Sequence, residues 1–266
     1  MTEYTSAQIR LALIKVGLRK GQTIFICPEI YKFGILKDIK NRSNYFKIFL
    51  KIIIGIIGKN GTIVINTYTF NTLRYKETFY FNAVSTTSGK MGDYLLGMKD
   101  SVRSNHPVFS VSSLGKLKKD ICQNNSLNNY GSGSPYKNFM KFNGKILNLG
   151  QDFWLNPFLH VAEFDAGIPY YYNKFTNVVY KNKNIKNKKF SSFVQYKHLN
   201  INYDFNKIKK LLLKNKFIKK ATLGSGMIFL YDVMDFYNTL SEQLKNDHYY
   251  LLKSPPNYTK SKTPFI

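Results

Sequence analysis

The chain has 266 residues and a mass of 30.9 kDa, and 44% of its residues are hydrophobic, which supplies a sizeable core and excludes a largely disordered protein. Cys27 and Cys122 lie far apart without a CxxC spacing, which argues against a disulfide framework or a structural zinc site and favours a reducing compartment. Lys and Arg number 40 against 15 Asp and Glu, a net charge of +25 that disfavours polycationic ligands.

The first third of the chain predicts a strand, a helix and a second strand. Residues 1–17 have the pattern of an amphipathic helix and lack the features of a signal peptide. A buried strand is expected from Thr23 to Cys27 and another from Thr62 to Thr67. Between them, the apolar run Tyr45–Gly58 is shorter than the roughly 20 residues of a membrane span. It favours a buried helix over a membrane-surface helix, and the order predicts a parallel crossover in an α/β layer.

The middle of the chain alternates short helices and strands. A helix is expected within residues 89–99, capped by the hydroxyl residues of "STTS" at 85–88. Residues 109–122 read as a strand followed by a helix. A loop that leads into another helix is expected over 124–139, and a strand over 144–150.

The last third predicts one more layer of strand and helix. The lysine-asparagine block Tyr180–Phe190 is expected to be a solvated hairpin tip or loop before a strand at 190–196. A helix, a strand with a turn and a closing amphipathic helix are expected over 203–247. No linker divides the chain, so residues 1–252 are predicted to form one compact α/β domain and residues 253–266 an extended tail.

Common phosphate-loop, metalloprotease and nucleophile-elbow motifs are absent from the sequence, and no metal site is expected. The segment 101–115 instead gathers an arginine, a histidine and serines around Pro107. Arginine with hydroxyls and free backbone amides can grip a carboxylate, an amide chain or a phosphate. A polar turn that satisfies its own backbone is the structural alternative.

His160 and Glu163 lie three residues apart in "NPFLHVAEFDAGIPY". A carboxylate beside a histidine fixes the tautomer of the ring and stabilises the cation that forms when the ring takes a proton. This arrangement suits a general base, although such a spacing by itself favours a hydrogen-bonded pair on a helix. His198 and His248 stand in polar stretches and are expected to be solvated.

Several segments in order resemble the aminoglycoside 3-N-acetyltransferase-like family. They are "GLRKGQTIFI", "GKNGTIVINTYTF", "GKMGDYLLGMKDSVRSNHPVFSVSSLG", "YGSGSPYKNFMKFNGKILNLG" and "NPFLHVAE". The ordered set is specific, whereas no single segment is. The resemblance implies acetyl-CoA as co-substrate and a single domain with a central mixed sheet flanked by helices, distinct from the GNAT fold.

The resemblance also implies roles for individual residues. His160 is expected to be the general base and Glu163 its orienting partner, while His106 and Asp165 are expected to bind the acceptor. The residues expected to hold the coenzyme are Pro28, Glu29, Ile30, Thr67, Thr69, Arg103, Ser104 and Ser110. The sequence departs from the family pattern in three places: Cys27–Ile30 replaces "HSSL", Asn66 replaces a proline, and Pro157 replaces a threonine.

The leading functional expectation is an acetyl-CoA-dependent N- or O-acetyltransferase that modifies an amino sugar or sugar nucleotide in surface polysaccharide biosynthesis. Basic charge suits a phosphorylated acceptor, although a general bias towards lysine explains the charge equally well. An aminoglycoside 3-N-acetyltransferase is the enzyme alternative. A basic nucleic-acid-binding protein or a non-catalytic relative is the alternative from another class. We expect a cytoplasmic monomer or homodimer, with no nucleic acid partner.

Overall fold

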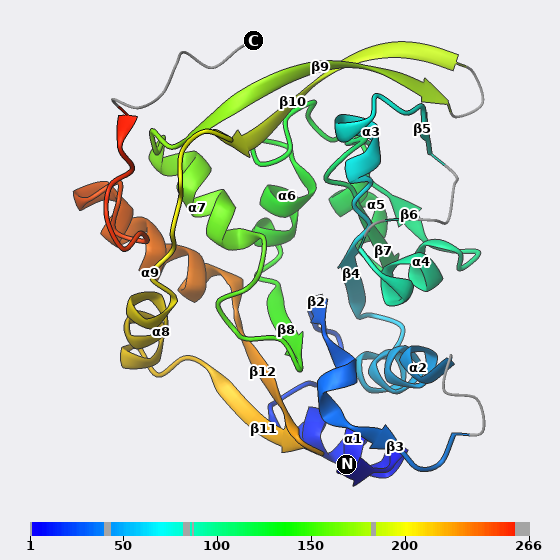
Figure 1. Cartoon of the computed structure of the whole chain (residues 1–266). Coiled ribbons are helices and arrows are strands. Elements are labelled where there is room, and N and C mark those ends of the chain that lie inside the picture. Colours follow the sequence, from blue (N-terminus) through cyan, green and yellow to red (C-terminus); the bar gives the residue numbers. More distant parts are fainter. Residues whose placement is uncertain (1, 40–43, 82–85, 87, 182–184, 259–266) are drawn as a thin grey trace.

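Seven strands form a mixed sheet at the centre of the molecule (Figure 1), which is described here by a computed structural model over residues 2–39, 44–81, 86, 88–181 and 185–258. The strand order is β11-β12-β8-β2-β4-β7-β6. The central strands β8, β2 and β4 run parallel, and the outer neighbours pair antiparallel. The strands are β2 (Thr23–Pro28), β4 (Thr62–Asn66), β6 (Val102–Arg103), β7 (Val111–Gly115), β8 (Lys145–Leu149), β11 (Lys219–Leu223) and β12 (Gly226–Asp232).

Helices cover both faces of this sheet. One face carries α1 (Ser6–Lys15), α2 (Tyr45–Ile57) and α4 (Lys90–Leu96). The other carries α5 (Lys118–Cys122), α6 (Pro135–Lys141), α7 (Phe158–Ala166), α8 (Phe205–Lys214) and α9 (Val233–Asn246). None of the helices in the described part of the chain has the length and apolar character that crossing a bilayer requires.

Alternation along β2 explains why the core has two halves. Phe25 and Cys27 belong to the cluster beneath α6, α7 and α9, whereas Ile24 and Ile26 belong to the cluster beneath α1 and α2. A strand buried on both faces reads as a continuous apolar run, as this one does. The expected parallel crossover is confirmed, because β2 pairs in parallel with β4 and α2 lies between them in the chain.

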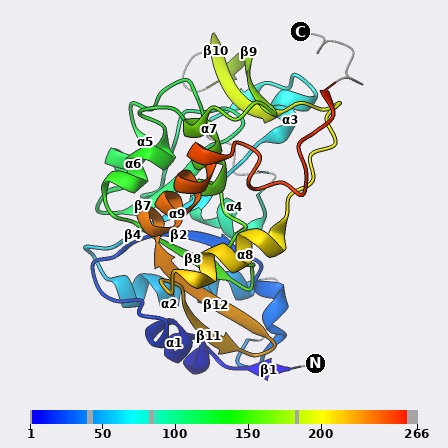
Figure 2. The same cartoon turned by 90° about the vertical axis from the view of Figure 1, so that its left-hand side faces the viewer.

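A second, smaller sheet lies at the end of the molecule away from α1 and β11 (Figures 1 and 2). It has the order β10-β9-β5, with β5 (Phe79–Tyr80), β9 (Tyr171–Lys181) and β10 (Ile185–Gln195). Of the two expected alternatives, a hairpin tip or a loop, the structure has a hairpin, but β9 and β10 extend further into the block Tyr180–Phe190 than its composition predicts. Residues 182–184 lie outside the described residues.

The reason is side-chain alternation in the hairpin. Val178, Tyr180 and Phe190 are buried in one cluster with Phe79 of β5, whereas the adjacent Asn177, Val179, Lys181 and Lys189 are exposed. The alternation extends the strands into a segment whose composition predicts a loop.

The expected hydroxyl cap of α4 is wrong. The helix begins after Gly89 without a side-chain hydrogen bond to its first turn. Ser88 faces the other way, and its hydroxyl accepts a hydrogen bond from the backbone N–H of Tyr68 at 2.5 Å. The predicted residue type was therefore present but serves the segment after β4.

The segment after α9 folds back onto the chain that precedes α8. Leu251 and Leu252 are buried, and Leu252 forms an antiparallel bridge with Tyr203. Beyond them residues 253–255, Asn257 and Tyr258 are exposed and Pro256 is buried, and the rest of the predicted tail, residues 259–266, lies outside the described residues.

Candidate active site

A cavity of about 490 Å³ opens at the carboxyl ends of β2 and β4 and beside the loop that follows β8. Pro28 at the end of β2 and Glu29 just after it line the cavity, as do Asn66 at the end of β4 and Tyr68 two residues beyond. Ligand sites of open α/β sheets lie at such strand ends. The wall is largely aromatic, with Tyr68, Phe70, Phe109, Tyr130, Trp154, Tyr203 and Phe205.

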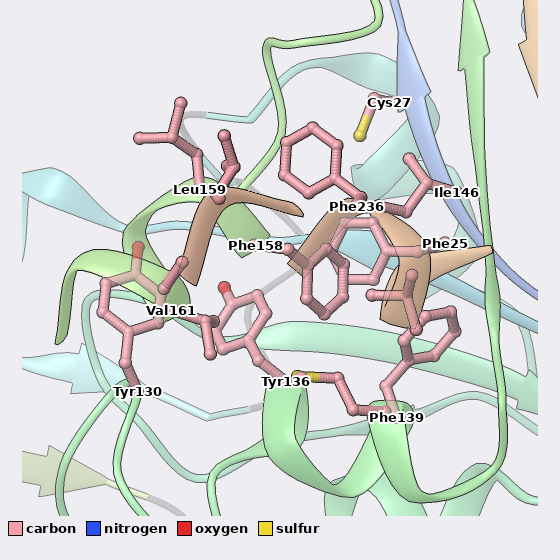
Figure 3. Packing of buried hydrophobic residues seen from close by; sticks show 14 of the residues in the cluster. Phe25, Cys27, Tyr130, Tyr136, Phe139, Ile146, Phe158, Leu159, Val161 and Phe236 are labelled. Carbon is pink, nitrogen blue, oxygen red and sulfur yellow. The ribbon is translucent and has the colours of Figure 1, made fainter. Parts of the chain in front are cut away.

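His160 lies in the first turn of α7 and lines this cavity. Phe158, two residues earlier, packs between Phe25 of β2 and Phe139 of α6, with ring centroids 5.2 and 5.4 Å away (Figure 3). The apolar residue therefore anchors the start of the helix to the sheet, and the histidine projects from the anchored turn.

The start of α7 is capped by an amide. Pro157 precedes the helix and has no side chain that could cap it, but the Oδ1 atom of Asn156 accepts a hydrogen bond from the N–H of Phe158 at 2.9 Å. The amide nitrogen of Asn156 donates to the carbonyl of Phe153 and to the hydroxyl of Tyr231, each at 3.2 Å. Asn156 thus supplies the side-chain acceptor at the start of α7 that Pro157 cannot provide.

Glu163 lies one turn further along α7, and its side chain is fully buried. Its Oε2 atom is 2.7 Å from Nδ1 of His160. A buried carboxylate must accept hydrogen bonds to offset its lost hydration. Two tyrosines supply them, since the hydroxyls of Tyr170 and Tyr203 donate to Oε1 at 2.9 and 2.8 Å.

These tyrosines stay protonated. Burial raises the pKa of the Tyr203 hydroxyl well above its ordinary value, and the nearby Glu163 carboxylate raises it further. Burial and the same carboxylate raise the pKa of Tyr170 as well. Both hydroxyls therefore remain hydrogen-bond donors to the carboxylate across the physiological pH range.

The pairing with Glu163 determines what the imidazole of His160 can do. A carboxylate accepts, so Nδ1 carries the proton in the neutral ring and Nε2 is left with its lone pair. The His160 side chain is 34% exposed, and the rings of Tyr130 and Tyr171 lie 6.2 and 5.7 Å from it. The arrangement can take a proton at Nε2 and hold the resulting charge beside Glu163.

Of the residues expected to hold the coenzyme, Pro28 and Glu29 reach the cavity. Glu29 forms an ion pair with Lys32, which stands in the short 3₁₀ helix η1 (Ile30–Phe33). Ile30 is buried in the core beneath α1 and α2 and is not part of the cavity wall. The segment that replaces "HSSL" therefore presents one paired carboxylate to the cavity.

In the segment 101–115, the side chains of Arg103, Ser104 and Ser110, which were expected to hold the coenzyme, are buried behind the cavity wall and do not line it. The Nε atom of Arg103 donates to Ser110 Oγ at 3.0 Å, and Nη2 donates to the carbonyl of Thr67 at 2.9 Å. Ser104 Oγ accepts from the N–H of Val111 at 2.9 Å. Burial lowers the pKa of Arg103 to about 10.

The segment 101–115 also fixes the chain just after β4, where Tyr68 lines the cavity. Thr69 donates from its hydroxyl to the carbonyl of Pro107, and its N–H donates to the carbonyl of Val108 at 3.0 Å. Between Thr67 and Thr69, Tyr68 reaches the cavity, and Phe109 packs on its ring at 5.4 Å. These polar residues therefore position aromatic wall residues.

The two residues expected to bind the acceptor lie elsewhere. His106 is 1% exposed, and its ring is fully used by backbone groups: Nδ1 accepts from the N–H groups of Val108 and Phe109, and Nε2 lies 3.1 Å from the carbonyl of Ser191. Asp165 pairs with Lys137 and accepts from the hydroxyl of Tyr237 at 2.6 Å. Neither residue lines the cavity, because each is turned towards protein partners.

Sequence reasoning missed Asn156, Tyr170 and Tyr203. An asparagine directly before a proline and an apolar helix is a recognisable capping signal, so Asn156 could have been found. Tyr203 carries no such local signal, since it is 40 residues from the carboxylate that it contacts, whereas Tyr170 is seven residues from Glu163.

Comparison with known proteins gives the family. The model of the aminoglycoside 3-N-acetyltransferases matches residues 36–245. An aminoglycoside N(3)-acetyltransferase III from Serratia marcescens is 35% identical over 82 residues, a stretch that spans 30% of the chain and 30% of that relative.

Solved structures share the fold at low identity. A binary complex of AAC-IIIb with CoASH has a TM-score of 0.78 and 18% identity, with 92% of this chain and 97% of that one covered. Aminoglycoside acetyltransferase AAC(3)-IVa, solved as a histidine-to-alanine mutant in complex with a gentamicin, has a TM-score of 0.78 and 19% identity over 96% and 93%. The YokD protein from Bacillus subtilis has a TM-score of 0.74 and 19% identity over 91% and 100%.

The solved structures agree with the mixed sheet and flanking helices described above, and the family model covers well over half of the sequence. The chain therefore belongs to the aminoglycoside 3-N-acetyltransferase family.

Proposed function

We propose that the protein transfers the acetyl group of acetyl-CoA to an amine or hydroxyl of an amino sugar or sugar nucleotide in surface polysaccharide biosynthesis. The observation that carries the catalytic part is the 2.7 Å contact between Nδ1 of His160 and Oε2 of Glu163 at the wall of the cavity. Membership of an acetyltransferase family and the likeness to AAC-IIIb, whose structure contains CoASH, support acetyl-CoA as the donor.

The geometry supports direct transfer with His160 as general base. Nε2 takes the proton from the acceptor while the acceptor nitrogen or oxygen bonds to the thioester carbonyl carbon. Glu163 stabilises the imidazolium that forms. When the carbon–sulfur bond breaks, His160 returns the proton to the sulfur, and the products are the acetylated acceptor and the free thiol of CoA.

Charge around the cavity favours an acceptor that is not a polycation. Among the described residues that line it, Glu29 is the only carboxylate, and Lys32 neutralises it. A site for several ammonium groups should carry unpaired acids. A basic protein with an aromatic cavity wall suits a sugar that carries phosphate, because sugar rings pack on aromatic faces and phosphate attracts lysine.

A thiol-release assay with acetyl-CoA tests the proposal against amino sugars, sugar nucleotides and aminoglycosides. With the correct acceptor, His160→Ala should lower kcat by about 10²- to 10⁴-fold, the usual contribution of a general base. His248→Ala is the matched control, because His248 is exposed and lies outside the cavity. Equal turnover by His160→Ala and the wild type would refute the assigned base.

The second candidate function is acetylation of aminoglycosides. It is favoured by the family and by the curated relative from Serratia marcescens. Rapid turnover of these antibiotics in the same assay, without turnover of sugar nucleotides, would select this function over the first.

A further inference from the structure

Tyr203 lies in the cavity wall and also contacts the pair formed by His160 and Glu163. Its side chain lines the cavity, and its hydroxyl donates to Oε1 of Glu163 at 2.8 Å. Its ring stacks on Phe205, another wall residue, with a centroid distance of 5.9 Å and an angle of 15°. No other described residue of the cavity wall has a hydrogen bond to Glu163 apart from His160 itself.

Backbone hydrogen bonds to the segment Leu251–Lys253 fix the backbone around Tyr203. Tyr203 forms a bridge with Leu252, Asp204 donates from its N–H to the carbonyl of Leu251, and Lys253 donates to the carbonyl of Asn202, the last two at 2.9 Å. These C-terminal residues lie beyond the span 36–245 that matches the family model. The hydroxyl of Tyr171 lies 3.2 Å from that of Tyr203 and limits its rotation.

We propose that Tyr203 is a positioning residue of the catalytic pair, held in place by the C-terminal segment Leu251–Lys253. This inference rests on the proposed acetyl transfer. Tyr203 and Tyr170 hold Oε1, which leaves Oε2 directed at Nδ1 of His160. The carboxylate cannot then turn without losing two hydrogen bonds.

The orientation of Glu163 decides the tautomer of His160. With Oε2 on Nδ1, the ring proton stays on Nδ1 and Nε2 is free to act as the base. If the carboxylate turns away, the proton can occupy Nε2, and this tautomer cannot accept the proton of the acceptor. Tyr203 therefore acts on the reaction through Glu163, without any need to touch the reacting atoms.

Tyr203→Phe is the central test, because it removes the hydroxyl and keeps the ring in the wall. We expect kcat to fall about 10- to 100-fold, the range for losing a hydrogen bond to a charged group, and KM for acetyl-CoA to change less than about twofold. Tyr237→Phe is the matched control. It removes a hydroxyl that donates to Asp165, another carboxylate of α7 that does not line the cavity, and should leave kcat unchanged.

A double-mutant cycle separates positioning from a general loss of structure. In a Glu163→Gln background, Tyr203→Phe should lower kcat by less than about threefold, because its effect passes through the carboxylate. Equal losses in the two backgrounds would overturn the proposal, as would a Tyr203→Phe variant with wild-type kcat. Thermal unfolding of each variant identifies any that lose the fold.

A second readout does not depend on turnover. The chain has four histidines, so ¹⁵N spectra of histidine-labelled protein can be assigned with His160→Ala. The wild type should show His160 protonated at Nδ1, and Tyr203→Phe should raise the population protonated at Nε2. If Tyr203→Phe shows this change of tautomer but the wild type releases no thiol with any acceptor, the positioning role is supported and the proposed function is rejected. An unchanged tautomer in Tyr203→Phe would reject the positioning role.

Discussion

His106 shows how a residue with a catalytic type of side chain can serve the fold. Its ring accepts two backbone N–H groups and contacts the carbonyl of Ser191. Burial lowers its pKa from 6.5 to about 4. Between these two values the unfolded chain binds a proton that the folded chain does not, so the free energy of unfolding should fall as the pH falls from 6.5 to 4. The expected loss is roughly 3 kcal/mol, present only below pH 6.5 and complete near pH 4.

Urea unfolding of the wild type and His106→Gln at pH 7 and pH 4.5 measures this loss. Glutamine can keep one acceptor and one donor but has no proton to gain. The fall in unfolding free energy between the two pH values should therefore be smaller in the variant by about 2 kcal/mol. Equal falls in both proteins would show that His106 is not the group that titrates.

At the residue scale, the contact between His160 and Glu163 was predictable and the residues of the cavity wall were not. His160 and Glu163 stand in one short segment, so their contact needs only the turn of a helix. Arg103 has the residue type of an anion ligand, but β6 directs it inward to Ser110 and Thr67. Sequence supplies the residue type and leaves the direction of the side chain to tertiary packing.

At the scale of the element, the cap of α7 links stability to catalysis. Asn156→Ala should lower the free energy of unfolding by about 1 kcal/mol, the usual cost of a lost helix cap. The first turn of α7 carries His160, so kcat should also fall. Asn156→Asp should restore part of both, because a carboxylate can accept from the N–H of Phe158. If Asn156→Ala has the same stability and the same kcat as the wild type, Asn156 does not act as the cap of α7.

Helices and strands with a clear pattern of apolar residues were predicted well, whereas the extent of the strands β9 and β10 could not be predicted from their composition. The apolar run of β2 and the helical spacing of α9 identify these elements without tertiary information. The hairpin β9–β10 contains lysines and asparagines, but its Val178, Tyr180 and Phe190 form a buried cluster with Phe79 of β5, which pairs with β9. This strand is far away in the sequence, so local composition could not reveal the pairing.

At the scale of the whole molecule, the net charge of +25 predicts how the acceptor is bound. If the acceptor carries phosphate, its KM should rise several-fold as salt increases from 0.1 to 1 M, because the Debye length falls from about 10 to about 3 Å. Acetyl-CoA, itself an anion, must be kept saturating throughout. A neutral amino sugar should show a KM that changes less than about twofold, and a polycationic aminoglycoside should show a KM that falls.

Substituting one lysine near the cavity and one far from it tests whether the charge acts at the acceptor site. Lys209 on α8 has its Nζ 5.6 Å from the ring centroid of Trp154, a residue of the cavity wall, whereas Lys15 is exposed on α1 beneath the opposite face of the sheet. Lys209→Gln should raise the KM of a sugar nucleotide at low salt and reduce its salt dependence. Lys15→Gln removes the same charge at a distance and should do neither. A KM that is independent of salt, or equal effects of the two variants, would mean that the excess lysine reflects composition and has no part in selecting the acceptor.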